Sequence, residues 1–150
     1  MAELATNKKA RFNYELLDTY EAGIELLGFE VRAVRSGFAH LDGAHVTIRG
    51  GEAYLLGATI SPYQPSNTPK HYFPDRNRKL LLTKKEIIEL GDIERTKRLT
   101  IVAVSMYNKG KRIKVAIATA RGKKKFDKRE TLKKRDAERD MQRTLTKYSE

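Results

Sequence analysis

Residues 99–119 read LTIVAVSMYNKGKRIKVAIAT, and this stretch decides the fold. Leu99–Tyr107 is a dense run of β-branched and other apolar residues, which is typical of a buried strand. Arg112–Thr119 alternates instead, and its inner face is expected to carry Ile113, Val115 and Ile117. Because the short segment Asn108–Gly110 between the two runs contains glycine, we expect a β-hairpin here.

A second hairpin is predicted earlier in the chain. His45–Arg49 alternates, with Val46 and Ile48 on one face. The pair Gly50-Gly51 then turns the chain into a second strand, which we expect over Glu52–Ile60.

A short helix is predicted between these hairpins. Thr83 and Glu86 have the spacing of a capping box, in which the hydroxyl and the carboxylate each bind a free backbone amide at the start of a helix. Gly91 is placed to end this helix.

The segment from residue 16 to residue 35 fits two patterns. Apolar residues recur there at helical spacing, but alternate residues from Leu16 to Leu26 also share one face of a strand. Gly23 and Gly28 disfavour one continuous helix, because each costs about 1 kcal/mol relative to alanine. We therefore expect a strand through Leu26 and then a helix from Gly28 to Arg35, stopped by Gly37.

The order of these elements predicts a mainly β protein, a small antiparallel OB-fold-like barrel with peripheral short helices. Ser61–Arg78 contains all four prolines and is expected to be a long, mobile loop. We expect residues 1–125 to form the barrel and residues 126–150 to form a basic C-terminal tail. From Arg121 to Glu150 there are twelve Lys and Arg but few large apolar residues, so the tail is expected to be disordered or helical only on a partner.

Composition excludes several functional classes. The 150 residues include no cysteine, which removes disulfides, thiolate catalysis and cysteine-based zinc sites. No apolar run approaches the roughly 18 residues of a membrane span, and the first residues do not resemble a secretory signal, so a cytoplasmic protein without a membrane partner is expected. The histidines lack metal-ligand spacing and there is no phosphate-binding glycine loop, so we expect no catalytic residue, metal or cofactor.

The charge predicts a polyanionic partner. Lys and Arg number 31 against 19 Asp and Glu, which gives a net charge of +12. Three basic patches stand out, at residues 7–11, 76–79 and 121–125, and such clusters neutralise phosphates and release counterions. Phe12, Tyr14 and Tyr20 near the first patch could stack on unpaired bases. Because no helix suited to the major groove of DNA is evident, RNA is favoured.

The tail has a helical pattern of its own. Asp127 and Glu130 are spaced as an N-cap and its partner. Ala137, Met141 and Leu145 then recur every four residues. A parallel basic stripe consists of Arg135, Arg139 and Arg143. Either a helix that forms on a phosphate-rich surface or a disordered tail would fit this pattern.

Several motifs, taken in order, resemble one known family. They are Asn7-Lys-Lys-Ala-Arg11, Tyr20-Glu-Ala-Gly23, Gly28-Phe-Glu-Val-Arg-Ala-Val-Arg35-Ser-Gly37, Glu52-Ala-Tyr-Leu55, Ile60-Ser-Pro62, Arg78-Lys-Leu-Leu-Leu82, Ala120-Arg-Gly-Lys-Lys124 and Asp127-Lys-Arg129. This set resembles the small protein B family, the tmRNA-binding (SsrA-binding) proteins of bacterial trans-translation.

The resemblance implies a non-catalytic adaptor with an OB-fold barrel. Proteins of this family bind the tRNA-like domain of tmRNA and deliver it to stalled ribosomes, where the tail enters the empty mRNA path near the decoding region of the small subunit. Elongation factor Tu and alanyl-tRNA synthetase would be indirect partners through tmRNA, and the protein is expected to be a monomer without cofactor or metal.

The resemblance and the basic patches together define the candidate sites. The RNA-binding candidates are Asn7, Lys8, Arg11, Tyr14, Glu21, Lys79, Leu80, Leu81, Arg121, Lys123, Lys124 and Lys125. The ribosome-facing tail candidates are Asp127, Lys128, Arg129, Lys133, Lys134, Arg135, Arg139 and Arg143. The amide of Asn7 can pair with base edges or phosphate oxygens, whereas Glu21 must accept from base amino groups or orient an arginine. Phe12 stands where relatives usually carry histidine. The phenylalanine ring can still stack on a base, but it cannot donate a proton or titrate as histidine does.

Two other interpretations remain open at this stage. A ribosomal or single-strand-binding OB protein would bind unrelated RNA as well as it binds tmRNA. A metal-dependent nuclease that uses Glu21 and Glu25 would cleave RNA.

Overall fold

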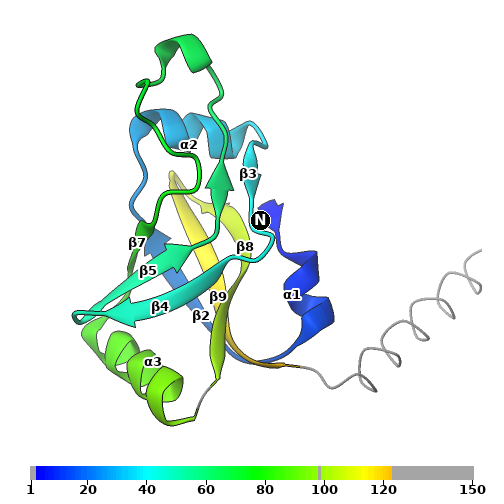
Figure 1. Ribbon diagram of the computed structural model, residues 1–150, viewed down its shortest axis with the longest axis vertical. Coiled ribbons are helices and arrows are strands. Elements are labelled where there is room, and N and C mark those ends of the chain that lie inside the picture. Colours follow the sequence, from blue (N-terminus) through cyan, green and yellow to red (C-terminus); the bar gives the residue numbers. More distant parts are fainter. Residues whose placement is uncertain (1–2, 98, 123–150) are drawn as a thin grey trace, which may run out of the picture.

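The computed structural model describes residues 3–97 and 99–122, which form a β-barrel with helices around it (Figure 1). The elements in chain order are β1 (Glu3–Thr6), α1 (Lys8–Asn13), β2 (Tyr14–Ile24), α2 (Gly28–Arg35), β3 (Ala39–His40), β4 (His45–Arg49), β5 (Glu52–Leu56), β6 (Thr59–Ile60), the 3-10 turn η1 (Pro65–Asn67), β7 (Arg78–Leu81), α3 (Lys84–Thr96), β8 (Thr100–Lys109) and β9 (Arg112–Gly122). No helix in these described ranges is long and apolar enough to cross a membrane.

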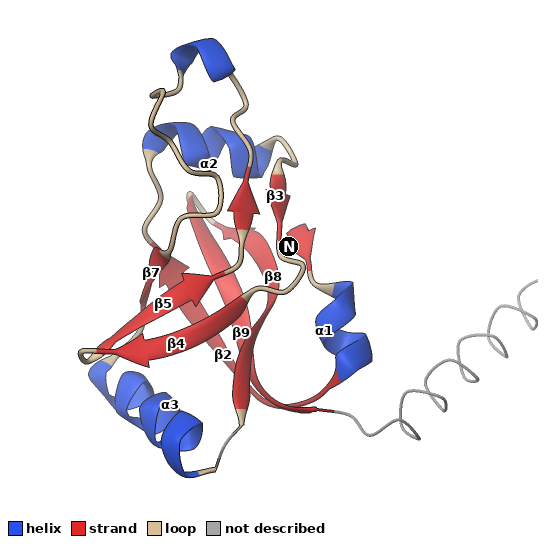
Figure 2. Cartoon of the chain, in the orientation of Figure 1, coloured by secondary structure: helices blue, strands red, loops and turns tan. Residues whose placement is uncertain are grey.

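The strand pairings run round a ring. The order is β8-β4-β5-β7-β2-β9, and β9 pairs back with β8, all antiparallel. The joins of β4 to β8 and of β2 to β7 are short, so the barrel is only partly closed along its length. Strand β1 extends the sheet beside β8, and β3 and β6 form a separate small sheet. The predicted mainly β, OB-fold-like architecture with peripheral short helices is confirmed (Figure 2).

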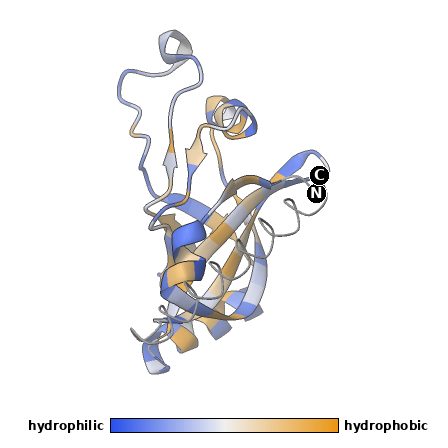
Figure 3. Cartoon of the chain, turned by 90° about the vertical axis from the view of Figure 1, so that its right-hand side faces the viewer, coloured by the Kyte–Doolittle hydropathy of each residue, from blue (hydrophilic) through white to orange (hydrophobic). Residues whose placement is uncertain are grey.

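The core lies inside this ring. Alternate residues of each strand point inward, and the largest apolar side chains that are fully buried include Leu41, Leu55, Leu80, Ile101 and Ile117. Burying one such side chain stabilises the fold by about 1.5–3 kcal/mol. Apolar residues accordingly concentrate on the strands, while the loop above α2 is mostly hydrophilic (Figure 3).

Both hairpins are confirmed. Gly50 and Gly51, each with positive φ, form a two-residue turn between β4 and β5. The β8–β9 turn is tighter than predicted, because Lys109 pairs with Arg112 and only Gly110 and Lys111 lie outside the strands. Ile113, Val115 and Ile117 face inward as expected.

Three element boundaries differ from prediction. The strand expected over Glu52–Ile60 breaks at Gly57, whose φ is +78° and where a Cβ would lie only 3.0 Å from the Gly43 carbonyl oxygen. Strand β2 ends at Ile24 rather than Leu26. Gly91 does not end α3, which continues to Thr96, because Gly91 packs against Ile48 inside the helix–sheet contact.

The helix α2 has the predicted bounds, and Gly37 follows it with a φ of +87°. Strands β1 and β7 and helix α1 were not predicted. Strand β7 begins at Arg78, the last residue of the predicted loop, and it exists because β2 and β5 pair with it on either side.

Candidate nucleic-acid interface

Helix α1 is fixed to the barrel by Asn7. The Asn7 Oδ1 accepts a hydrogen bond from the Ala10 N–H at 3.1 Å and so caps the helix. Its Nδ2 donates to the Ala103 carbonyl at 2.9 Å, and its backbone N–H donates to the Val104 carbonyl at 2.8 Å, both on β8. The residue is 2% exposed. In this structure the amide is buried and bonded within the protein, so it positions α1 rather than facing solvent, and its direct pairing with RNA stays a prediction.

This cap presents three cations to solvent. Ala10 packs against Val102 and Ala120 on the inner side of α1. On the outer side lie Lys8, Lys9 and Arg11, which are exposed and form no ion pair with any described residue. We call these three residues the α1 basic face. Free cations of this kind are suited to phosphate oxygens.

A pocket of about 390 Å³ adjoins the α1 basic face, between α1 and strands β4 and β8. Its lining includes Lys9, Asn13, Tyr14, His45 and Thr100. Tyr14 thus lies beside the basic residues, as predicted. An aromatic ring among amide, imidazole and hydroxyl groups can both stack on a base and hydrogen-bond to its edge.

Arg121 is exposed but lies apart from this pocket. It pairs in register with Glu15, whereas Tyr14 pairs with Gly122. Because successive residues of a strand point to opposite faces, Arg121 and Tyr14 project from opposite sides of the sheet. The structure therefore does not bring Arg121 together with the α1 basic face.

Glu21 lies on the outer surface of the barrel and organises two neighbours. Its carboxylate accepts hydrogen bonds from the Tyr107 hydroxyl at 2.5 Å and from the Lys109 Nζ at 2.8 Å. The bonds from Lys109 and Tyr107 hold the pKa of Glu21 below its ordinary value. Burial and the bond to Glu21 raise the pKa of Tyr107 to about 12. Glu21 orients a lysine and a tyrosine, not an arginine.

Leu81 lies near Glu21, at the same end of β2. It is 50% exposed and pairs with Gly23, where a side chain would have its Cβ only 3.2 Å from the Leu81 Cβ. Leu81 and Gly23 both line a pocket of about 310 Å³. The same pocket is lined by four cations, Arg35, Lys111, Arg112 and Lys114. We call this the hairpin basic pocket, because three of the four cations come from the β8–β9 turn and β9.

The neighbouring residues of β7 have other roles. Leu80 is 1% exposed and belongs to the core, so the structure does not place its side chain where RNA could contact it. Lys79 is half-buried and pairs with Glu52 at 2.9 Å. The bonds to Lys79 and Tyr54 lower the pKa of Glu52, and the bond to Glu52 raises the pKa of Lys79.

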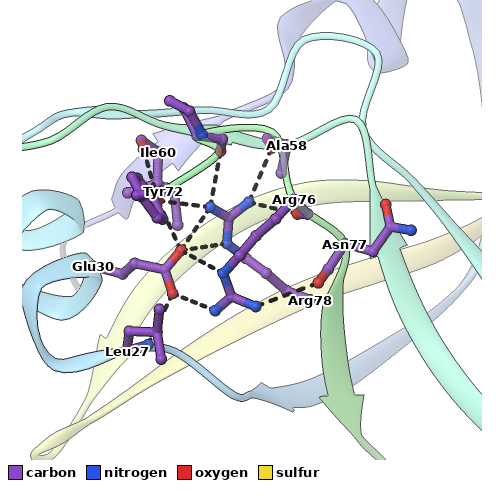
Figure 4. Close-up of polar contacts among 9 residues, drawn as sticks. Leu27, Glu30, Ala58, Ile60, Tyr72, Arg76, Asn77 and Arg78 are labelled. Carbon is purple, nitrogen blue, oxygen red and sulfur yellow. Dashed lines mark hydrogen bonds and ion pairs between the residues drawn. The ribbon is translucent and has the colours of Figure 1, made fainter. Parts of the chain in front are cut away.

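The predicted basic patch at residues 76–79 is largely an internal ion-pair network (Figure 4). The Glu30 side chain of α2 is fully buried and accepts bonds from Arg78 Nη2 at 2.6 Å and Arg78 Nε at 2.9 Å. Arg76 also pairs with Glu30, and the Tyr72 hydroxyl donates to it at 2.8 Å. Burial alone would raise the pKa of Glu30, but the bonds from these partners and from the Leu27 N–H outweigh burial and lower it. Arg78 is therefore not available to RNA.

The candidate residues fall into two groups along β2. Tyr14 begins this strand beside the α1 basic face, and Gly23 lies near its end beside the hairpin basic pocket. Tyr14 and Gly23 are nine positions apart on the strand, which corresponds to up to about 30 Å. Tyr20 belongs to neither group, because its hydroxyl donates to Glu89 of α3 at 3.0 Å. Lys123–Lys125 and all the tail candidates from Asp127 to Arg143 lie outside the described residues.

Sequence reasoning missed several residues of the hairpin basic pocket. Arg35 donates from Nη2 to the Lys111 carbonyl at 2.7 Å, which joins α2 to the β8–β9 turn. The four cations at residues 109, 111, 112 and 114 were a signal, since they surround a predicted turn. These cations lie near Leu81 and Arg35 because of the strand order, which the spacing of residues along the sequence does not predict.

Comparisons with known proteins agree on one family. The sequence model of a family described as "SmpB protein" matches residues 4–147. An SsrA-binding protein of Gloeothece citriformis is 50% identical over 146 residues, which cover 97% of this chain and 94% of that protein. An SsrA-binding protein of Mesoplasma florum is 49% identical over 136 residues, which cover 91% of both chains.

A solved structure also resembles this chain. It is described as "tmRNA-SmpB: a journey to the center of the bacterial ribosome", and one of its chains superposes with a TM-score of 0.65 at 41% sequence identity. The match covers 80% of this chain and 84% of that chain.

Proposed function

The chain belongs to the SmpB protein family, and from this membership we propose that it is an RNA-binding adaptor that binds the tRNA-like domain of tmRNA and delivers it to stalled ribosomes for trans-translation. The observation that carries the proposal is the near full-length identity to SsrA-binding proteins, together with the likeness to a chain of a tmRNA-SmpB structure. The proposal also assigns separate surfaces of the chain to tmRNA and to the ribosome.

The α1 basic face and the hairpin basic pocket are the two proposed RNA-binding surfaces. Lys8 and Arg11 are exposed and unpaired among the described residues, so each can neutralise a phosphate without breaking an internal bond. Asn7 supports them as a positioning residue through the α1 cap. Leu81 and Lys114 supply an apolar contact and a cation in the hairpin basic pocket. Lys109, which Glu21 holds, adds a second cation from the end of β8.

We propose no catalytic role for the acidic residues. A carboxylate that activates water or holds a metal needs free oxygens, and both oxygens of Glu21 accept bonds from Tyr107 and Lys109. Glu30 is buried in its arginine network. Incubating the protein with intact RNA and magnesium tests this directly: cleavage that EDTA stops would contradict it.

Residues 126–150 are proposed as a separate functional unit that acts on the ribosome, with residues 1–125 binding tmRNA. Asp127, Lys128 and Arg129 would start the tail helix. Lys133, Lys134 and the basic stripe of Arg135, Arg139 and Arg143 would face ribosomal RNA. The protein is proposed to act as a cytoplasmic monomer, and to meet elongation factor Tu and alanyl-tRNA synthetase only through tmRNA. Deleting residues 127–150 should leave tmRNA affinity intact and abolish tagging of nascent chains; normal tagging would contradict the division.

The main experiment is equilibrium binding to the isolated tRNA-like domain of tmRNA, with an ordinary tRNA as competitor, across a salt series. A preference for the tmRNA domain that persists near physiological salt supports a shaped recognition surface. Equal affinities that fall together as salt rises would mean generic charge neutralisation and would contradict the proposal.

A further inference from the structure

A third pocket lies between the first turn of α2 and the loop of residues 61–77. Its volume is about 300 Å³, and its lining comprises Gly28, Phe29, Arg32, Tyr63 and Gln64. Tyr63 is 45% exposed. Arg32 is exposed, and its side chain makes no hydrogen bond or ion pair with any residue in the described ranges. We call this the α2–loop pocket. This hollow combines two aromatic rings with a guanidinium whose side chain has no partner in the described ranges.

Ring and polar contacts tie one wall of this pocket into the fold. The Phe29 ring meets the Tyr72 ring edge to face, with centroids 4.8 Å apart. The Tyr72 hydroxyl has two acceptors within reach of its one proton, Glu30 at 2.8 Å and the Ile60 carbonyl at 2.9 Å, and it accepts from Arg78 at 2.9 Å (Figure 4). The buried ion-pair network therefore anchors the base of the loop from which Tyr63 projects. A preformed pocket loses little conformational entropy when a ligand enters it.

The charge around the pocket favours an anionic ligand. The buried network contains two guanidiniums and one carboxylate, so it keeps a net charge of +1 behind Phe29 and Tyr72. Arg32 adds a free cation at the pocket itself. Arg35, three positions later on α2, lines the hairpin basic pocket, so the two pockets adjoin across one helix face.

We infer that the α2–loop pocket binds one unpaired nucleotide of tmRNA, with the base stacked on Tyr63 and the phosphate paired with Arg32. The inference rests on the proposed function and extends its surface from Leu81 and Arg35 round α2 to Tyr63. Base stacking on an aromatic side chain and charge-assisted bonding to phosphate are the two interactions that single-stranded RNA offers.

The test measures the affinity of the full chain for the tRNA-like domain of tmRNA. Tyr63→Leu should weaken binding about tenfold, because stacking on one aromatic ring is worth a factor of this order. Arg32→Gln should weaken binding and make the log–log salt dependence shallower by about one unit. Matched controls are Phe73→Leu, an exposed aromatic of the same loop outside the pocket, and Arg49→Gln, an exposed arginine at the β4–β5 turn. Both controls should stay within about twofold of the unmodified protein.

Ultraviolet crosslinking of the unmodified complex, followed by peptide mapping, gives a second readout that loss of stability cannot imitate. A crosslink in the peptide that contains Tyr63 or Phe29 supports the inference. Suppose that the unmodified protein prefers the tmRNA domain over tRNA but that all four variants bind this domain as tightly as the unmodified protein does. The inference then fails and the proposed function stands. If Tyr63→Leu weakens only ribosome binding, the pocket serves another partner and the inference also fails. If the unmodified protein shows no preference, the proposed function itself fails.

Discussion

Glu30 and Arg78 form an ion pair in which neither side chain is exposed, with the Arg78 Nη2 2.6 Å from the Glu30 carboxylate. The two residues belong to α2 and β7, which are separated in the chain by strands β3 to β6 and the loop of residues 61–77. Arg78 also donates to the carbonyls of Ala58 at 3.1 Å and Pro74 at 2.8 Å. One buried guanidinium thus ties a helix, a strand and a loop to one another.

Removing one partner of this pair should destabilise the protein strongly. In Glu30→Gln, Arg78 remains buried without its counter-charge, and such changes cost about 3–5 kcal/mol. Urea unfolding followed by circular dichroism measures the loss. The control is Arg95→Gln, which removes an exposed ion pair with Asp92 and should change the free energy of unfolding by less than about 1 kcal/mol. Equal effects of the two substitutions would contradict the buried role.

The same pair predicts an acid-sensitive stability. Because the pKa of Glu30 is lower in the folded protein than its ordinary value of 4.5, the unfolded chain binds this proton first as the pH falls. The stabilisation is therefore complete above about pH 4.5 and is lost as the pH falls towards the folded pKa, by at most about 1.4 kcal/mol per pH unit. The difference in free energy of unfolding between the unmodified protein and Glu30→Gln should narrow as the pH falls below about 4.5. A difference that stays constant down to about pH 3 would contradict the acid-sensitive role of Glu30.

Gly91→Ala should stabilise the protein. Gly91 lies inside α3, and a Cβ there would meet the Ile48 Cγ2 at 3.6 Å, an ordinary van der Waals contact. Alanine is favoured over glycine within a helix by about 0.8–1 kcal/mol. Thermal unfolding should therefore show a higher midpoint for Gly91→Ala. A lower midpoint would mean that the α3–β4 contact has no room for a methyl group.

Much of the fold could be predicted because its signals are local. The glycine pair at 50–51, the capping box of Thr83 and Glu86, and the alternation over Arg112–Thr119 each depend on a few adjacent residues. Strand β7 depends instead on pairing with β2 and β5, and no pattern within Arg78–Leu81 requires it. Gly91 was misread because a glycine inside a helix and one that ends it differ only in what packs against them.

The candidate site was harder to predict than the fold. Charge and exposure agree for Lys8 and Arg11, whose short helix has no acidic partner in the described structure. Arg78 has the same charge but is paired with Glu30, 48 residues earlier in the chain. A basic residue is free for RNA only if the fold brings no carboxylate to it, and spacing along the chain does not contain that information.

Asn7→Ala should weaken RNA binding through stability and position rather than through a lost contact. The substitution removes the α1 cap and the bond to Ala103, with an expected cost of about 1–2 kcal/mol in the free energy of unfolding. Lys8→Ala should leave that free energy unchanged and reduce the salt dependence of tmRNA binding by about one unit. Measuring both quantities on both variants separates the roles. A loss of affinity in Asn7→Ala without any loss of stability would instead indicate direct RNA contact.

Glu21 should act on RNA through Lys109. The carboxylate holds the Lys109 Nζ at 2.8 Å and the Tyr107 hydroxyl at 2.5 Å, and it would repel a phosphate placed against it directly. Glu21→Gln made alone should therefore weaken tmRNA binding several-fold. The same substitution in a protein that already carries Lys109→Ala should have little effect. A double-mutant cycle on tmRNA affinity measures this coupling. Additive effects of the two substitutions would show that Glu21 contacts the RNA on its own, by accepting from a base amino group.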